Sequence, residues 1–283
     1  MSLGGYLQLP FVQHALIAGA LVAVTCGLIG PFVISRSMAF AVHGTSELAF
    51  TGAAAGLLIA GNAVAGALGG AVVVATLIGA LAVRERERDS SIGVILAAGL
   101  GLGVLLLGYY HGFATEATNI LFGDIFGVSN GQLAVLVAID VGVVALMTVL
   151  FRPLMFASVD PDVAQARGVR TRLIGIVFLY PLALTVTAAA QVVGTLLVLS
   201  LAITPAAAAQ RLVTGPLAVA GLSIGFALLA ADGGLLASLE SSTVKPSVFV
   251  TGISFGIYLV ARAVGPSIKR AARARASRAR LSA

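Results

Sequence analysis

Long apolar runs fill this chain and restrict the folds that it can adopt. A membrane-spanning helix needs about 20 mostly apolar residues, and runs of this kind recur between residues 11 and 265. Hydrophobic residues make up 59% of the 283 residues and charged residues only 10%, whereas soluble domains are about 25% charged. These proportions exclude a soluble enzyme, a disordered chain and a collagen-like fibre. Because the runs are continuous, not alternating as in barrel strands, they predict an all-α, polytopic transmembrane helical bundle.

Eight to nine spans fit in this length, and nine can be placed on the sequence. They cover approximately residues 11–34, 38–60, 62–83, 92–110, 131–150, 173–190, 192–210, 216–236 and 247–265. This placement puts 16 of the 17 Lys and Arg residues on one side, because only Lys245 falls on the other. Positive residues concentrate in cytoplasmic loops, so that side and the C-terminus on it are expected to be cytoplasmic. A re-entrant segment would change this assignment. Residues 1–268 are expected to form a single transmembrane domain.

A basic tail, residues 269–283, follows the last span. Its Lys and Arg residues number six, which equals the formal net charge of +6 for the whole chain. The tail has no aromatic residue on which a base could stack, so contact with anionic membrane lipid is favoured over a nucleic-acid partner. We expect this tail to be cytoplasmic and disordered.

Two ionisable residues, His43 and Glu47, lie inside the second predicted span. They are four positions apart, so a helix places them on one face. Ionisable side chains within spans are costly and usually face a cavity or the bundle interior. Imidazole and carboxylate groups both bind first-row divalent metals. The pair therefore indicates either a metal site or a buried pair that only orients helices.

Three connecting segments carry further signals. Residues 111–130 contain Glu116 and Asp124 but no positive charge, and their apolar middle is too short to span, which suits either a re-entrant segment with an acidic mouth or a solvated loop. In residues 151–172, Asp160 is a good N-cap, Pro161 fits a first helical turn and Gly168 fits a C′ stop, which predicts a short helix outside the bilayer.

The third segment is the span at residues 192–210. Thr204–Pro205 interrupts it and predicts a kink, because proline cannot donate a helical hydrogen bond. Such kinks often border cavities, although packing alone also explains them. Gln191 adds a polar side chain at the outer end of this segment.

Several motifs that would indicate an enzyme are missing from the sequence. It has no phosphate-binding G-x-x-x-x-G-K-[ST] loop, and no H-E-x-x-H, C-x-x-C or G-x-S-x-G pattern. The chain is therefore not expected to be an enzyme or to bind ATP through such a loop.

Four segments resemble the membrane permease of bacterial ABC importers for zinc, manganese and iron. They are MAFAVHGTSELAFTGAAAGLL (38–58), NILFGDIFGVS (119–129), DPDVAQARGV (160–169) and VVGTLLVLSLAITPAAAAQRL (192–212). The similarity covers roughly residues 10 to 265, and the order and spacing of the segments also fit.

The resemblance implies a metal-ABC-importer permease in a bacterial cytoplasmic membrane. Two copies, a homodimer, would form the pathway, two copies of a separate ATPase would bind beneath, and an extracytoplasmic metal-binding protein would deliver the ion. The helix after Asp160 would couple to the ATPase. Its implied contact residues are Asp160, Pro161, Asp162, Ala166, Arg167 and Gly168.

The resemblance also implies, by position, that His43 and Glu47 form the pathway metal site. Glu116 and Asp124, interpreted above as an acidic mouth, are then the expected outer entry for the ion. Most of the family carries Asp at the position of His43 and His at the position of Glu47, so the two chemical types are exchanged here. This mixture does not separate zinc, manganese and iron. The metal is the transported ion, and no permanently bound cofactor is expected.

Three other functions remain open at the level of sequence. A secondary carrier or channel would work without an ATPase. A permease for a larger chelate, such as a siderophore or cobalamin, is usually a longer chain. A membrane scaffold would need no ionisable residues within its spans.

Overall fold

The computed structural model describes residues 5, 8–81, 88–110, 123–195, 197–240 and 244–281. This part of the chain is helical and contains no strand, which confirms the all-α class. The elements are α2 (Pro10–Ser35), α3 (Ala39–Ala60), α4 (Ala63–Leu81), α5 (Arg88–Gly108), the 3-10 helix η1 (Ile125–Gly127), α7 (Asn130–Val159), α8 (Pro161–Ala166), α9 (Thr171–Val193), α10 (Val198–Ala202), α11 (Thr204–Leu212), α12 (Pro216–Ser238) and α13 (Pro246–Leu281).

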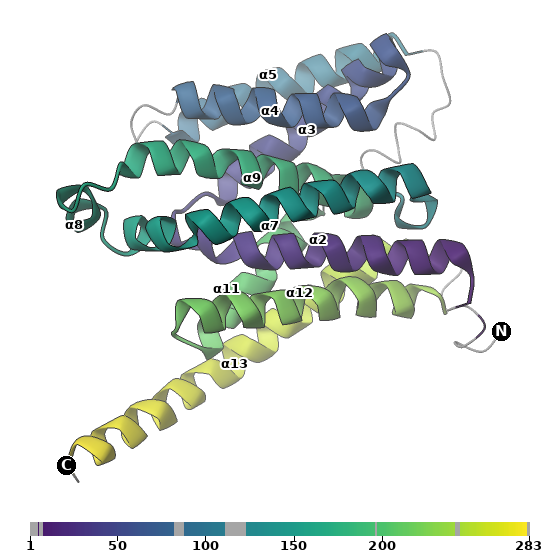
Figure 1. Cartoon of the computed structure of the whole chain (residues 1–283). Helices are drawn as coiled ribbons and strands as arrows, with labels where there is room; N and C mark the ends of the chain where they lie inside the picture. Colours follow the sequence, from purple (N-terminus) through teal and green to yellow (C-terminus); the bar gives the residue numbers. More distant parts are fainter. Residues whose placement is uncertain are drawn as a thin grey trace.

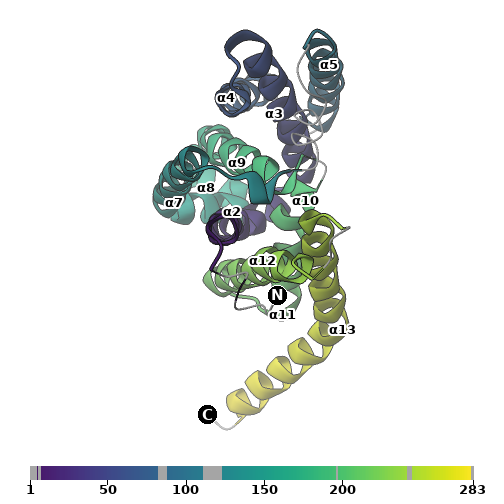
Figure 2. The same ribbon diagram turned by 90° about the vertical axis from the view of Figure 1, so that its right-hand side faces the viewer.

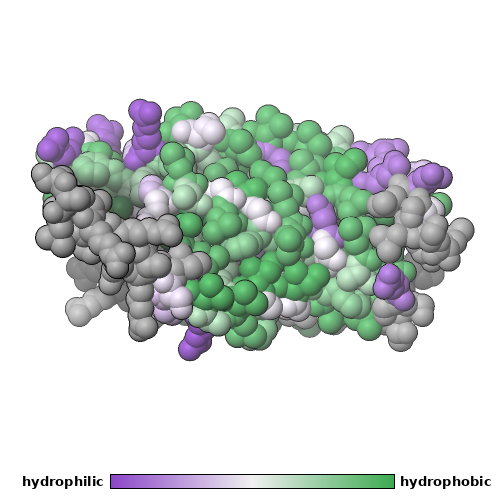
Figure 3. Space-filling model, turned by 90° about the horizontal axis from the view of Figure 1, so that it is seen from below, coloured by the Kyte–Doolittle hydropathy of each residue, from purple (hydrophilic) through white to green (hydrophobic). Residues whose placement is uncertain are grey.

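Most of the long helices run in the same general direction (Figure 1), so the molecule has two ends. We name them the α8 end, which also carries the C-terminus, and the η1 end, where the N-terminus lies. Apolar residues form a broad band between more polar ends (Figure 3). Large apolar side chains are widely exposed in this chain, and Ile59, Val94 and Val149 are each more than 70% exposed. Six helices are long and apolar enough to cross a membrane, and residues 92–108 and 198–212 form shorter apolar helices. The polytopic membrane fold is therefore confirmed.

The helices form three groups when the bundle is viewed from its end (Figure 2). Helices α3, α4 and α5 pack together on one side, and α11, α12 and α13 pack together on the other. Helices α2, α7 and α9 lie between them. Helix α2 contacts members of all three groups and is buried along most of its length by small residues such as Ala15, Ala18 and Ala23. Small side chains let neighbouring helices approach closely in a bilayer, which explains the central place of α2.

Helix α7 begins at a complete capping box and continues beyond the predicted span. The Ser129 hydroxyl accepts a hydrogen bond from Gln132 N at 3.2 Å, and Gln132 Oε1 accepts one from Ser129 N at 3.0 Å. The sequence predicts an end near residue 150, but the helix continues to Val159. It continues because Leu154 and Ala157 remain buried against the rest of the bundle.

The short helix predicted after Asp160 is present as α8. Asp160 Oδ1 accepts a hydrogen bond from Val163 N at 3.0 Å, and Pro161 occupies the first turn. Gly168 follows with a φ of +83°, a conformation that residues with a Cβ rarely adopt. Only Ala164 of this helix is buried.

The predicted seventh span is not one helix. Helix α9 ends at Val193, and the chain then forms α10 and α11 with a break at Ile203. The predicted interruption at Thr204–Pro205 is confirmed. Pro205 has no N–H to offer the carbonyl group of Leu201, so the helical hydrogen-bond pattern cannot continue through it.

Helix α13 extends through the basic tail to Leu281, where the sequence predicts disorder. The Ala and Arg residues of this tail are strong helix formers, which accounts for the difference. The domain boundary at residue 268 stays a prediction.

Candidate functional site

His43 and Glu47 lie one turn apart on α3, but their surroundings differ. His43 is half-buried, and its Nδ1 atom is inaccessible to solvent and has no hydrogen-bond partner among the described residues. Glu47 is only 4% exposed. A buried nitrogen without a partner is costly, so the Nδ1 atom of His43 is a buried polar atom for which the described residues supply no partner.

His43 opens onto a groove of about 500 Å³ between α3 and the interrupted segment. The residues that line this His43 groove are Ala39, Phe40, His43, Leu199, Ser200, Ile203 and Thr204. Glu47 does not line it, although the helical spacing predicts a shared face. The wall of the groove opposite α3 contains Ser200 and Thr204. In the sequence, only the predicted break at Thr204–Pro205 indicates that this segment borders a cavity.

One copy of the chain offers few metal ligands at this place. Nowhere in the described ranges do three His, Cys, Asp or Glu residues cluster closely enough to hold one ion. Structural and catalytic metal sites in proteins usually have at least three protein ligands. His43 and Glu47 of one copy therefore provide at most part of a coordination sphere.

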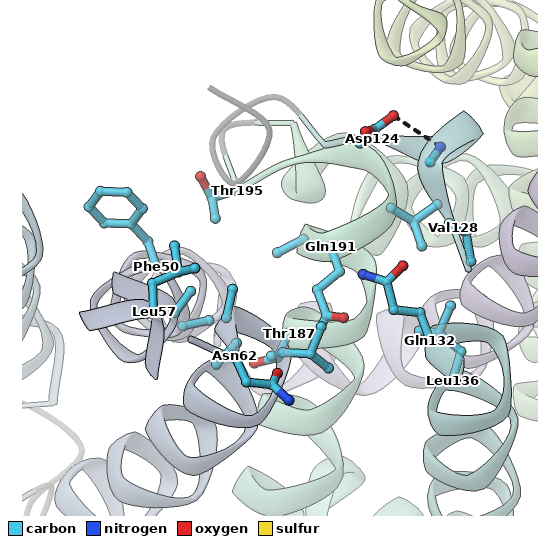
Figure 4. Close-up of a pocket in the computed structure, with 18 of the residues that line it drawn as sticks. Phe50, Leu57, Asn62, Asp124, Val128, Gln132, Leu136, Thr187, Gln191 and Thr195 are labelled. Atoms are coloured by element: carbon cyan, nitrogen blue, oxygen red, sulfur yellow. Dashed lines mark hydrogen bonds between the residues drawn. The ribbon is translucent and has the colours of Figure 1, made fainter. Parts of the chain in front are cut away.

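A second cavity, which we name the amide pocket, lies between α3, α7 and α9 toward the η1 end. Its volume is about 380 Å³, and its polar lining residues are Asn62, Asp124, Gln132, Thr187, Gln191 and Thr195. Figure 4 shows the side chains of Asn62, Gln132, Thr187 and Gln191 converging on it. Thr187 is fully buried, and its hydroxyl and the Nε2 atom of Gln191 have no partner in the described part of the chain. The pocket can therefore hold water or another hydrogen-bonding group.

Asp124 lines this pocket and also has a structural role in the loop. Its Oδ1 atom accepts a hydrogen bond from Gly127 N at 3.0 Å and so caps η1 (Figure 4). The preceding Gly123 has a φ of +76°, and an added Cβ would come within 2.5 Å of the backbone of Val193. This close approach holds Asp124 against the end of α9. Glu116, the other residue predicted at the mouth, lies outside the described residues.

The amide pocket and the His43 groove share two walls. Helix α3 supplies Phe50 to the pocket and His43 to the groove, and the segment after α9 supplies Thr195 to the pocket and Thr204 to the groove. Between the cavities, the Ser46 hydroxyl donates a hydrogen bond to the Thr195 carbonyl at 2.8 Å. Sequence reasoning missed Ser46, Thr187 and Gln132, since a lone hydroxyl or amide in a helix carries no distinctive pattern.

Helix α8 forms an exposed projection at the α8 end (Figure 1). It packs on α7 and α9 through Ala164, and all six predicted coupling residues are exposed. These are Asp160, Pro161, Asp162, Ala166, Arg167 and Gly168. They do not lie at either cavity, so the metal and coupling predictions concern separate parts of the molecule.

Comparison with known proteins identifies the family. The sequence profile of the ABC 3 transport family matches residues 8–265. The chain belongs to this family. The resemblance found in the four sequence segments is thereby confirmed.

Two relatives and one solved structure illustrate the similarity. The manganese transport system membrane protein MntC of Halalkalibacterium halodurans is 33% identical over 192 residues, which cover 68% of this chain and 66% of that protein. The high-affinity zinc uptake system membrane protein ZnuB of Haemophilus influenzae is 30% identical over 246 residues, covering 83% of this chain and 91% of that protein. A chain in the structure of PsaBC from Streptococcus pneumoniae in complex with Fab superposes with a TM-score of 0.83 and 25% identity, covering 94% of this chain and 96% of that one.

Proposed function

We propose that the chain is the permease subunit of an ABC importer for a divalent transition metal. Family membership carries this proposal, and relatives named for manganese and for zinc transport support these two ions ahead of iron. ATP hydrolysis takes place on a separate soluble subunit, since the sequence has no phosphate-binding loop. An extracytoplasmic metal-binding protein delivers the ion.

The η1 end faces outward, and the α8 end faces the cytoplasm. Arg152 lies in the C-terminal part of α7, Arg170 directly precedes α9, and Arg211 lies in the last turn of α11. Their place at the α8 end agrees with the enrichment of positive charge on the cytoplasmic side. The ion enters near Asp124, reaches His43 and Glu47 and leaves at the α8 end. Helix α8 transmits the movement of the ATPase, because all of its residues except Ala164 are exposed and can contact a cytoplasmic partner.

His43 and Glu47 from two copies of the chain hold the transported ion. The unpartnered Nδ1 atom of His43 supports this role, because metal-binding imidazoles need one ring nitrogen free for the ion. The scarcity of further ligands among the described residues of one copy supports a site shared by two copies.

Uptake assays on a transport-deficient bacterial strain test the proposal. His43→Ala and Glu47→Ala should each abolish accumulation of one metal, measured by elemental analysis, while membrane abundance and association with the ATPase persist. His14→Ala provides a matched control, because His14 is also a half-buried imidazole within a span but lies on α2. Normal uptake by both pathway variants would rule out the site.

The same assay separates an ABC importer from a secondary carrier. Uptake should stop when the partner ATPase carries an inactivating substitution in its phosphate-binding loop. Continued uptake would instead favour a carrier that needs no ATPase.

A further inference from the structure

We propose that Thr204 is an oxygen ligand for the ion in the His43 groove and sets its preference between manganese and zinc. This inference rests on the proposed function and extends it from α3 to the interrupted segment. Thr204 begins α11 directly after the break and lines the groove together with His43.

The Thr204 hydroxyl differs from those of most other hydroxyl residues in these helices. Thr45, Thr76 and Thr148 each donate a hydrogen bond to a carbonyl group in the preceding turn of their own helix. No hydrogen bond of the Thr204 hydroxyl is found among the described residues, although the side chain is half-buried. Neither the hydrogen nor the lone pairs of this hydroxyl are engaged by a described residue, so the hydroxyl can turn its oxygen toward a ligand in the groove.

The break also changes the hydrogen-bond partner of the Ser200 carbonyl, which lies four residues before Thr204. In a continuous helix, the Ser200 carbonyl would accept a hydrogen bond from the amide four residues later, that of Thr204. Here the Ser200 carbonyl accepts one from the Ser254 hydroxyl of α13, at 2.8 Å. The Ser200 carbonyl therefore already has a partner on α13, and the Thr204 side chain lines the groove without bonding to it.

Helix α13 holds this wall in position. Besides the Ser254 contact, the hydroxyl groups of Ser200 and Thr251 lie 3.2 Å apart, and Ser200 also donates to the Leu197 carbonyl at 2.7 Å. These three contacts fix α10 from behind. Ser200 is accordingly a positioning residue, whereas Thr204 is the residue that touches the ion.

Oxygen ligands change which metal the groove favours. Imidazole suits zinc well, whereas oxygen ligands suit manganese. His43 and Glu47 supply one imidazole and one carboxylate, a mixture that does not separate the two metals, and the added Thr204 oxygen shifts this ligand set toward manganese. Substrate sites of transporters are commonly formed by discontinuous helices, and the break at Ile203 has this form.

The test compares Thr204→Val with Thr204→Ser in cells that receive manganese and zinc together. Valine keeps the shape of threonine but removes the hydroxyl, and serine restores it. We expect Thr204→Val to lower the ratio of manganese to zinc uptake about tenfold, the equivalent of ~1.4 kcal/mol. Thr204→Ser should stay within about twofold of the wild type, which is ~0.4 kcal/mol.

Thr185→Val is the matched control. Thr185 has a buried hydroxyl without a partner among the described residues, but it lies on α9 and does not line the groove. Its substitution should leave the ratio unchanged. Equilibrium binding of Mn²⁺ to the purified permease in detergent, measured from the free-ion electron paramagnetic resonance signal, should weaken in Thr204→Val alone.

Two results would overturn the inference. One is a Thr204→Val protein with the wild-type metal ratio, and the other is equal loss of both metals in Thr204→Val and Thr204→Ser, which would indicate a role in shape. Either result leaves the proposed function intact as long as His43→Ala abolishes uptake. Normal uptake by His43→Ala would instead count against the pathway site itself.

Discussion

Two carboxyl residues inside the spans lie away from both cavities and face the central helix. Asp140 of α7 is 5% exposed and accepts a hydrogen bond from the Thr25 hydroxyl of α2 at 3.2 Å. Asp232 of α12 lies beside Gly19 of α2, where an added Cβ would stand 3.1 Å from its Oδ1 atom. Carboxyl groups within a bilayer are costly unless they find polar partners. The Thr25–Asp140 contact therefore links α2 to α7 and gives the Asp140 carboxyl group one polar partner.

Replacing Thr25 with valine should destabilise the permease by about 1 kcal/mol, a typical upper value for hydrogen bonds between membrane helices. The thermal unfolding midpoint in detergent measures this loss. Thr185→Val, which removes a hydroxyl that has no partner among the described residues, should lower the midpoint less. Equal shifts in the two variants would show that the Thr25–Asp140 contact contributes nothing beyond packing.

The sequence could identify some of these residues and not others. His43 and Glu47 are visible because ionisable groups are rare within apolar runs, and Asp124 because it lies in an acidic loop. Thr187 and Ser46 remain invisible, since their importance depends on which segments fold beside them. Ser46 contacts Thr195 from 149 positions away in the sequence.

At the scale of elements, the seventh predicted span shows where hydropathy fails. Residues 192–210 are apolar enough to suggest a helix, yet the structure divides them into α10 and α11. Pro205 indicates the break, but the extent of the irregular backbone from Gly194 depends on contacts with α3 and α13. Caps are better predicted, because Asp160 and its partner Val163 lie in one local segment.

Helix α8 gives a prediction that depends on this local cap. Asp160→Ala should cost the short helix about 1 kcal/mol, whereas Asp160→Asn should retain the cap, because asparagine is an equally good N-cap residue. If α8 couples the permease to its ATPase, metal-dependent ATP hydrolysis by the reconstituted complex should fall in Asp160→Ala and persist in Asp160→Asn. Equal rates of ATP hydrolysis in both variants would show that coupling does not depend on the Asp160 cap.

At the scale of the whole molecule, the two sides of the bundle differ. The His43 groove lies on the side that carries α10, and α7 lies on the opposite side (Figure 2). On the groove side, Phe40 leaves 42% of its surface exposed beside His43. Both sides are apolar, so hydropathy alone cannot tell a lipid-facing side from one that meets a second copy. If His43 holds the ion as proposed, the second copy is expected on the groove side, where it would bring a second imidazole.

Site-directed cross-linking tests this arrangement. Cys26, the only cysteine, is buried, so a Cys26→Ala protein gives a background without thiols. In that background, Phe40→Cys should form a covalent dimer with a short bis-maleimide in native membranes. Val149 is 74% exposed and belongs to α7, the helix on the far side (Figure 2), so the Val149→Cys protein should stay monomeric. Added Mn²⁺ or Zn²⁺ should change the cross-linking yield for Phe40→Cys only, since an ion shared by two His43 side chains would draw the groove walls together.

The opposite result, a covalent dimer of Val149→Cys but not of Phe40→Cys, would place the second copy against α7. His43 would then face lipid, which would contradict a metal site shared between two copies.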